Sequence, residues 1–278
     1  MDLKNTQNQL INSISYSLNI MDVKNTLRSY ENDTPQYQLY RDMHRNQTYD
    51  YVKGMKEKYG KCQKTQMTIT KAFSLLDNFI DPSDPDLDVP NTIHAYQTAE
   101  RIRKKYPNDK EFQIIGLIHD VGKVLFSFGE PSWAVVGDTY VLGCDFPKSI
   151  VYYDTLKESP EYRKYDMFGL YKSKCGLDNL MISYGHDEYL YNVLKKNKNH
   201  LLSQKYLDVI RYHSLYPWHT NGDYKHLTNK KDEWVLENVV EFNTFDLYSK
   251  EDNTLIDIHV KSYYYDILNE YFFGELCW

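Results

Sequence analysis

One stretch constrains this 278-residue chain more than any other, an apolar segment that ends in an adjacent histidine and aspartate. The segment runs from Phe112 to Ile118, and His119 and Asp120 follow it directly, with Lys123 four positions after the histidine. Core packing alone does not explain this order, because buried imidazole and carboxylate groups need polar partners. A metal ion is the strongest such partner. The stretch therefore predicts a helix that carries part of a metal site.

Composition and charge exclude several classes of protein. Apolar residues make up 41% of the sequence and charged residues 26%, which is typical of globular proteins. The net charge is −6 and both signs are mixed along the chain, so we expect no nucleic-acid or membrane partner. No apolar run approaches the roughly 20 residues of a membrane span. The four cysteines are widely spaced, which argues against a thiolate zinc site and a disulfide framework. A cytoplasmic protein is expected.

Helical periodicity dominates the sequence, and convincing strands are few. We expect helices over residues 36–59, 69–79, 91–106, 110–123, 177–195, 204–215, 231–248 and 262–272. Asn91 is a candidate N-cap, and Pro107 and Pro217 are expected to end helices. The short apolar runs at 135–136 and 150–152 fit loops or a minor hairpin. The predicted fold class is all-α, a single helical bundle with long functional loops, preceded by a flexible N-terminal arm over residues 1–26.

Two segments between the helices predict functional loops. Residues 81–86 read Asp-Pro-Ser-Asp-Pro-Asp, and two prolines within six residues exclude a helix interior or a central strand. Residues 127–147 are rich in glycine and proline and contain Gly137 and Asp138. Both loops could offer oxygen atoms to a hydroxyl-rich ligand, although acidic residues in loops are usually solvated.

Five of the expected helices carry a residue that can bind a metal on or beside an apolar face. These residues are His94, His119 with Asp120, His186, His213 and Asp246. Imidazole and carboxylate ligands suit iron, manganese or zinc. Four imidazoles and two carboxylates are too many for one catalytic ion that keeps open positions, so two ions that share a carboxylate are expected. Helical bundles are common hosts for such pairs.

Each candidate also has a purely structural interpretation. His94 can cap a helix, His186 can lie in a solvated turn, and His213 can be a core histidine with satisfied hydrogen bonds. Asp246 stands between two apolar residues and needs a partner. Lys123 can be an exposed lysine at a helix C-terminus or can hold a substrate hydroxyl. The other histidines are expected at the surface: His44, His200, His219, His226 and His259.

The order of an isolated histidine, a His-Asp pair and a distant aspartate resembles the HD-domain superfamily of metal-dependent phosphohydrolases. Longer strings are similar to the myo-inositol oxygenase family. They are Asp-Pro-Ser-Asp-Pro-Asp at 81–86, Phe-Gly-Glu-Pro-Ser-Trp-Ala-Val-Val-Gly-Asp-Thr at 128–139, Ser-Tyr-Gly-His-Asp-Glu-Tyr at 183–189, His-Ser-Leu-Tyr-Pro-Trp-His-Thr at 213–220 and Glu-Phe-Asn-Thr-Phe-Asp-Leu-Tyr at 241–248. The resemblance extends over residues 27–278 and implies one HD-type catalytic domain there.

This resemblance implies a non-haem di-iron oxygenase that cleaves the ring of myo-inositol with O2 to give D-glucuronate. One iron would be held by His94, His119, Asp120 and Asp246, and the other by His186 and His213, with Asp120 bridging a mixed-valent Fe(II)/Fe(III) pair. Lys123 would contact the substrate oxygens, so Lys123 and Asp120 are the catalytic candidates. The other substrate contacts would be Arg28, Asp81, Ser83, Gly137, Asp138, His213 and Ser214.

Two other functions are compatible with the same residues. An HD-type phosphohydrolase would share His119, Asp120 and Asp246 but would need no redox metal. A catalytically inactive binding protein could keep the fold without turnover. Release of phosphate without O2 consumption would indicate the first, and stoichiometric iron would argue against the second. The expected partner is a small molecule, and the chain is expected to be a monomer.

Overall fold

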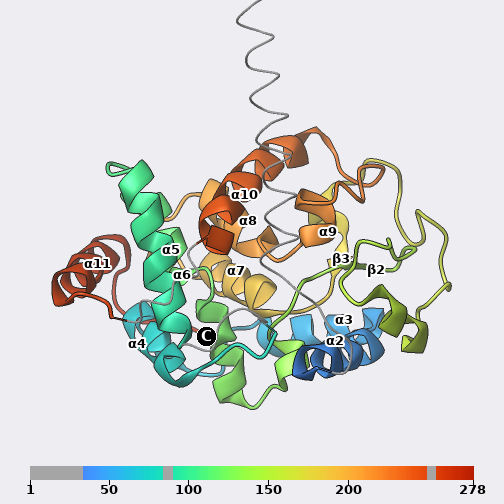
Figure 1. Cartoon of the computed structure of the whole chain (residues 1–278), viewed down its shortest axis with the longest axis horizontal. Coiled ribbons are helices and arrows are strands. Elements are labelled where there is room, and N and C mark those ends of the chain that lie inside the picture. Colours follow the sequence, from blue (N-terminus) through green and yellow to red (C-terminus); the bar gives the residue numbers. More distant parts are fainter. Residues whose placement is uncertain (1–33, 84–89, 249–254) are drawn as a thin grey trace, which may run out of the picture.

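The computed structural model describes residues 34–83, 90–248 and 255–278. The predicted arm at 1–26 and the candidate substrate contact Arg28 lie outside these residues. The described part is mainly helical, with four strands of two residues each, which confirms the predicted all-α class. Figure 1 shows the helices gathered around α6 and α7, with α2 and α3 at one side and α11 on the outside of α5.

The elements follow one another with short connections in most places. The α-helices are α2 Pro35–Asn46, α3 Tyr49–Tyr59, α4 Ile69–Ser74, α5 Asn91–Lys105, α6 Lys110–Ile118, α7 His186–Lys196, α8 Gln204–Tyr212, α9 Tyr216–His219, α10 Lys230–Tyr248 and α11 Ile258–Tyr271. The 3-10 helices are η1 Leu75–Asn78, η2 Val121–Phe128, η3 Ser132–Ala134, η4 Tyr153–Glu158 and η5 Leu177–Asn179. Strand β1 Gln66–Met67 pairs antiparallel with β4 Leu276–Cys277, and β2 Val141–Leu142 pairs with β3 Met181–Ile182.

The predicted helix over 36–59 is two helices, because a threonine starts a new one in its middle. The Thr48 hydroxyl accepts from the backbone N–H of Tyr51 and caps α3. The preceding residue, Gln47, turns inward: its amide donates to the Tyr184 carbonyl over 2.6 Å and accepts from the Tyr184 N–H over 2.9 Å. The break between α2 and α3 thus holds the chain two residues before His186.

Several predicted boundaries are wrong for identifiable reasons. The helix expected from residue 177 begins only at His186, since residues 177–179 form a 3-10 turn and 181–182 are β3. Asn91 is the first helical residue rather than the N-cap, and its side chain turns toward Asp120. Pro217 lies inside α9 instead of ending α8. Residues 135–136 and 150–152 form no strand, which agrees with the expectation that these short apolar runs are loops.

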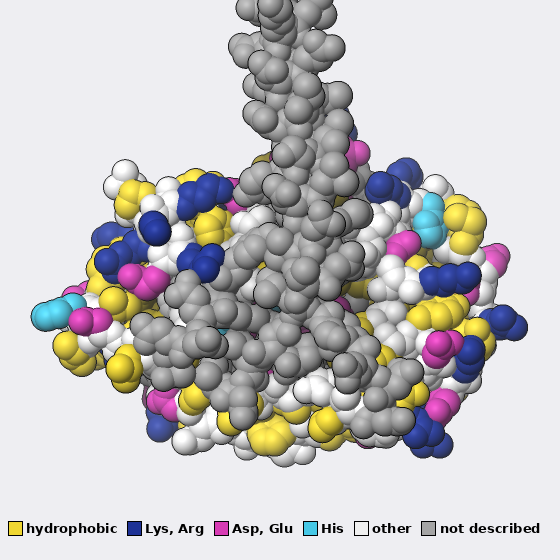
Figure 2. Space-filling model, viewed as in Figure 1, with side chains coloured by type: hydrophobic (Ala, Val, Ile, Leu, Met, Phe, Trp, Pro, Cys, Tyr) yellow, Lys and Arg dark blue, Asp and Glu magenta, His cyan; other side chains and the backbone are white. Residues whose placement is uncertain are grey.

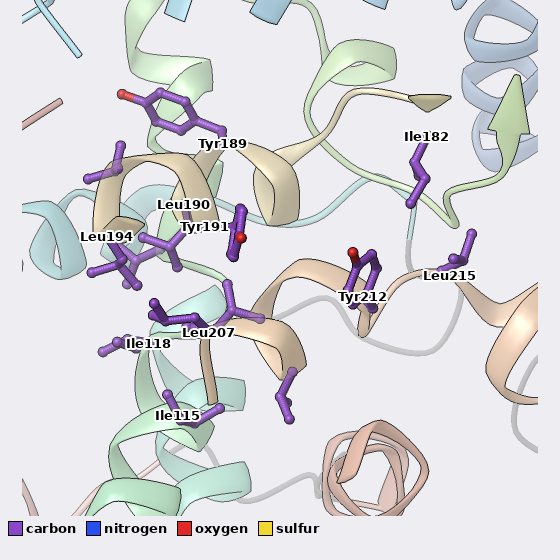
Figure 3. Close-up of a cluster of buried hydrophobic side chains, with 14 of the residues drawn as sticks. Ile115, Ile118, Ile182, Tyr189, Leu190, Tyr191, Leu194, Leu207, Tyr212 and Leu215 are labelled. Carbon is purple, nitrogen blue, oxygen red and sulfur yellow. The ribbon is translucent and has the colours of Figure 1, made fainter. Parts of the chain in front are cut away.

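The core forms where α6, α7 and α8 meet. Figure 3 shows Ile115 and Ile118 of α6, Leu190 and Leu194 of α7, and Leu207 of α8 directed at one another. All of them are nearly inaccessible to solvent. Burial of one such side chain contributes roughly 1.5–3 kcal/mol. This packing holds the C-terminal ends of α6 and α8 against the beginning of α7, where the polar candidates lie.

A glycine after α6 sets the distance between η2 and α7. A Cβ atom built at Gly122 would overlap the backbone carbonyl of His186, which cannot move without shifting α7. We therefore expect Gly122→Ala to reduce the free energy of unfolding by about 1–3 kcal/mol, as overpacking does. Gly54 in α3 has nothing within 4 Å of its added Cβ, so Gly54→Ala should stabilise by about 0.5–1 kcal/mol. Chemical denaturation of the two metal-free variants measures their free energies of unfolding. Equal values for Gly122→Ala and Gly54→Ala would contradict the prediction.

The surface carries mixed charge. On the face shown in Figure 2, basic and acidic side chains of the described residues alternate around the rim. Among the described helices, none has both the length and the apolar character that crossing a membrane requires.

Candidate metal centre

Six side chains predicted as metal ligands converge in one pocket. His94 lies in the first turn of α5, His119 and Asp120 directly follow α6, and His186 is the first residue of α7. His213 directly follows α8, and Asp246 lies near the end of α10. All six are at most 9% exposed. Segments that are up to 152 positions apart in the sequence thus supply one buried set of nitrogen and oxygen donors.

The first donor group comprises His186, His213 and one oxygen of Asp120. Nδ1 of His186 donates to the Val135 carbonyl over 2.8 Å, and Nδ1 of His213 donates to the Ile210 carbonyl over 2.7 Å. A carbonyl only accepts, so Nδ1 carries a proton in both rings and Nε2 is the nitrogen that faces the pocket and is available to a metal ion.

These Nε2 atoms face each other at close range. The two Nε2 atoms are 3.2 Å apart, and Oδ1 of Asp120 is 3.1 Å from Nε2 of His186 and 3.8 Å from Nε2 of His213. One proton could join only two of these three atoms. A metal ion would satisfy all three, and the carbonyl contacts that orient the rings are typical of metal-binding histidines.

The second donor group comprises His94, His119 and Asp246, together with Asp120. Oδ1 of Asp246 is 2.9 Å from Nε2 of His94 and 3.3 Å from Nε2 of His119. Nε2 of His119 also lies 3.5 Å from Oδ2 of Asp120, and its Nδ1 donates to the Gly116 carbonyl over 2.9 Å. His94, His119 and Asp120 offer ligand atoms within 4.8 Å of one another, as do Asp120, His186 and His213.

Asp120 joins the two groups, since each carboxylate oxygen faces one of them. Burial alone would raise the pKa of Asp120, but the Lys123 ammonium and His119 hold it well below its usual range. Burial likewise opposes ionisation of Asp246, yet contacts with His119 and His94 keep its pKa well below the ordinary value. Both carboxyl groups are therefore ionised at neutral pH, which a ligand of a cation requires.

Lys123 is buried, which excludes the interpretation as an exposed lysine. The turn after α6 tightens into η2, so Lys123 reaches Asp120 three residues earlier rather than sharing a helix face with His119. Its Nζ lies 2.7 Å from Oδ2 of Asp120 and 2.7 Å from Oδ2 of Asp81. Burial would lower the pKa of Lys123, but these two carboxylates raise it above its ordinary value. Lys123 is a fixed cation beside both donor groups.

The candidate substrate contacts within the described residues line the same pocket. They are Asp81, Ser83, Lys123, Gly137, Asp138, His213 and Ser214. The Asp81 carboxylate accepts from the Ser83 hydroxyl over 2.6 Å and from its backbone N–H over 2.8 Å, which shapes the start of the aspartate loop. Thr139 N donates to the Ser214 carbonyl over 2.8 Å, so the glycine-rich loop is held against the segment after α8.

Four lining residues were not predicted as site residues: Tyr40, Asn91, Tyr216 and Leu247. The Tyr40 hydroxyl accepts from Asp138 N over 3.0 Å and donates to the Asp138 carboxylate over 3.3 Å. Tyr40 is one of the buried residues of α2, and its position in the sequence gives no indication of this contact. Asn91 resembled a helix cap, which is the commoner role of asparagine before a helix.

Two of the five histidines expected at the surface are buried, so this prediction is wrong for His44 and His219. Nδ1 of His44 lies 2.6 Å from the Thr155 hydroxyl, and burial lowers the pKa of His44 to about 3. Nε2 of His219 donates to the His213 carbonyl over 2.8 Å and so supports that segment. Polar neighbours in the sequence therefore do not show that a histidine is exposed in the folded protein. His259 is exposed, and His200 and His226 are partly buried.

Comparison with known proteins identifies the family. A family model described as "Myo-inositol oxygenase" matches residues 34–278. The inositol oxygenase of Danio rerio is 44% identical over 262 residues, covering 92% of this chain and 94% of that protein. The probable inositol oxygenase of Oryza sativa is 47% identical over 265 residues (91% and 85%), and inositol oxygenase 1 of Arabidopsis thaliana is 45% identical over 263 residues (91% and 84%). The chain therefore belongs to the myo-inositol oxygenase family.

Proposed function

We propose that this protein is an inositol oxygenase, which cleaves the ring of myo-inositol with O2 and releases D-glucuronate. The observation that carries the proposal is the convergence of four imidazoles and two ionised carboxylates around Asp120, inside a pocket that Lys123 also lines. Family membership supports the substrate and the reaction. HD-type phosphohydrolysis is not favoured, because the relatives are oxygenases.

We infer that two iron ions occupy this pocket, one at each donor group. His94, His119 and Asp246 would hold the first ion and His186 with His213 the second, and Asp120 would be a ligand that both ions share. The donors are nitrogen and oxygen atoms without thiolate, a set that iron accepts. When bound, the iron pair supplies the electron transfer and the O2 activation that no protein side chain can supply.

The chain itself would bind and orient the polyol. Hydroxyl groups both donate and accept, and the pocket offers carboxylates at Asp81 and Asp138, hydroxyls at Ser83 and Ser214, and the Lys123 ammonium. Charged partners give the stronger hydrogen bonds. A ring that carries a hydroxyl on every carbon could engage several of these groups at once, which fixes the carbon that faces the metal pair.

Lys123 would donate a hydrogen bond to a substrate hydroxyl oxygen and stabilise negative charge that builds up on it. Its ammonium is buried and already oriented by Asp81 and Asp120, so little reorganisation accompanies the reaction. A cation on Asp120 would compete for that carboxylate and weaken the Lys123–Asp120 ion pair. Asp81 would then keep the lysine within the pocket, directed at the substrate.

The proposal also includes the extent of the catalytic domain, the oligomeric state and the location of the protein. Residues 27–278 would form the catalytic domain, and the protein would act as a monomer in the cytoplasm. The described cysteines, Cys62, Cys144, Cys175 and Cys277, are all unpaired. Free thiols suit a reducing compartment.

The function is tested by measuring two reactions on the same protein preparation, the oxidation of myo-inositol by O2 and the hydrolysis of phosphate esters. Metal-free protein is loaded with Fe(II) and a mild reductant, and O2 uptake is followed with myo-inositol. We expect O2 uptake above the background of iron and reductant only when protein, iron and substrate are all present, and none above background when Zn²⁺ replaces iron, because zinc has no redox chemistry. Hydrolysis of phosphate esters with Zn²⁺ or Mg²⁺, without O2 uptake, would contradict the proposal.

A further inference from the structure

Asn91 contacts the carboxylate that joins the two donor groups. It is the first residue of α5 and is 5% exposed. Its Nδ2 donates to Oδ2 of Asp120 over 3.0 Å. Its backbone N–H donates to the Phe79 carbonyl over 2.9 Å, which fixes the start of α5 against the end of η1. The side chain is short and its backbone is anchored, so the amide has little freedom to leave Asp120.

The orientation of this amide follows from the charge of Asp120. An ionised carboxylate only accepts hydrogen bonds, so the amide must present its NH2 group and not its oxygen. The Asn91 oxygen is then buried without a hydrogen-bond partner among the residues described. An unsatisfied buried acceptor is energetically unfavourable. The contact with Asp120 therefore outweighs this cost and determines the amide's orientation.

We propose that Asn91 is a positioning residue for the metal pair, an inference that rests on the proposed function. Asn91 and Lys123 both donate a hydrogen bond to Oδ2 of Asp120. Lys123 is on a flexible stem and would also serve the substrate. Within the described residues, the Asn91 side chain hydrogen-bonds to Asp120 and to no other charged side chain. Asn91 would fix the rotation of the carboxylate so that Oδ1 stays directed at His186 and His213 while Oδ2 faces His119.

The test is metal binding in the absence of substrate, with Mn²⁺ as the probe and its free EPR signal as the readout. Asn91→Leu keeps the branched shape of the side chain and removes the N–H donor, and Asn91→Ala removes both. Groups that orient a metal ligand contribute about 10–100-fold to metal affinity. We expect both variants to weaken Mn²⁺ binding by about that factor, while the thermal midpoint of the metal-free protein stays close to that of the unmodified chain.

The matched control is Thr92→Ala, which removes an equally buried polar side chain from the same helical turn but outside the metal pocket. It should bind Mn²⁺ as the unmodified protein does. Unchanged affinity in both Asn91 variants would overturn the inference, and so would a loss in Asn91→Ala that Asn91→Leu restores, because that pattern indicates packing. If the unmodified protein binds no metal, the proposed function itself fails.

Discussion

Asp120→Ala is expected to lose the metal pair and, with it, turnover. Asp120 lies 3.1 Å from His186, 3.5 Å from His119 and 2.7 Å from Lys123, so the substitution removes the group that both donor sets share. Groups that only orient a metal ligand contribute about 10–100-fold to metal affinity, so loss of the shared ligand itself should lower the affinity by more than about 100-fold.

Metal analysis after gel filtration and the EPR signal of the coupled iron pair measure this loss. Asp208→Ala is the matched control, because Asp208 is equally buried and ionisable but lies on α8 outside the pocket. That variant should retain both ions. A coupled iron pair that persists in Asp120→Ala would exclude Asp120 as the bridge.

Lys123→Met is expected to reduce kcat by about 10²- to 10³-fold, the effect of removing one preorganised donor from a developing negative charge. Methionine fills nearly the same volume as lysine and removes only the ammonium. Because Lys123 contacts Asp120 without belonging to either donor group, the variant should still bind two metal ions. Steady-state kinetics and metal analysis on the same sample separate these two effects.

Lys56→Met provides the comparison for Lys123→Met. Lys56 also pairs with a buried carboxylate, that of Glu188 at 2.9 Å, but it lies outside the metal pocket. Its substitution should lower stability and leave kcat near that of the unmodified protein. Normal turnover in Lys123→Met would remove the lysine from the mechanism.

Some of the residues that meet in the pocket could be picked out from the sequence because they interrupt an apolar pattern. Asp246 between two apolar residues and the His-Asp pair after an apolar run both need polar partners, and tertiary structure supplies them. Periodicity also located α5, α10 and α11 to within a few residues. These features are local, so a single sequence contains them.

Contacts across the fold could not be predicted in this way. The beginning of α7 at His186 depends on Gln47, which binds Tyr184 from 137 positions away. The burial of His44 depends on Thr155, and the orientation of Asn91 depends on Asp120. Spacing reports which residues share a helix face, but it does not report which distant segment packs against that face.

The most direct test of the account is the stoichiometry of the reaction on an oxygen electrode. Iron-loaded protein receives limiting myo-inositol, and D-glucuronate is assayed at the end point. Conversion of C6H12O6 and O2 to glucuronate, water and a proton predicts one O2 consumed for each glucuronate formed, with no uptake before inositol is added. O2 uptake that yields no glucuronate, or loss of inositol without O2 uptake, would contradict the account.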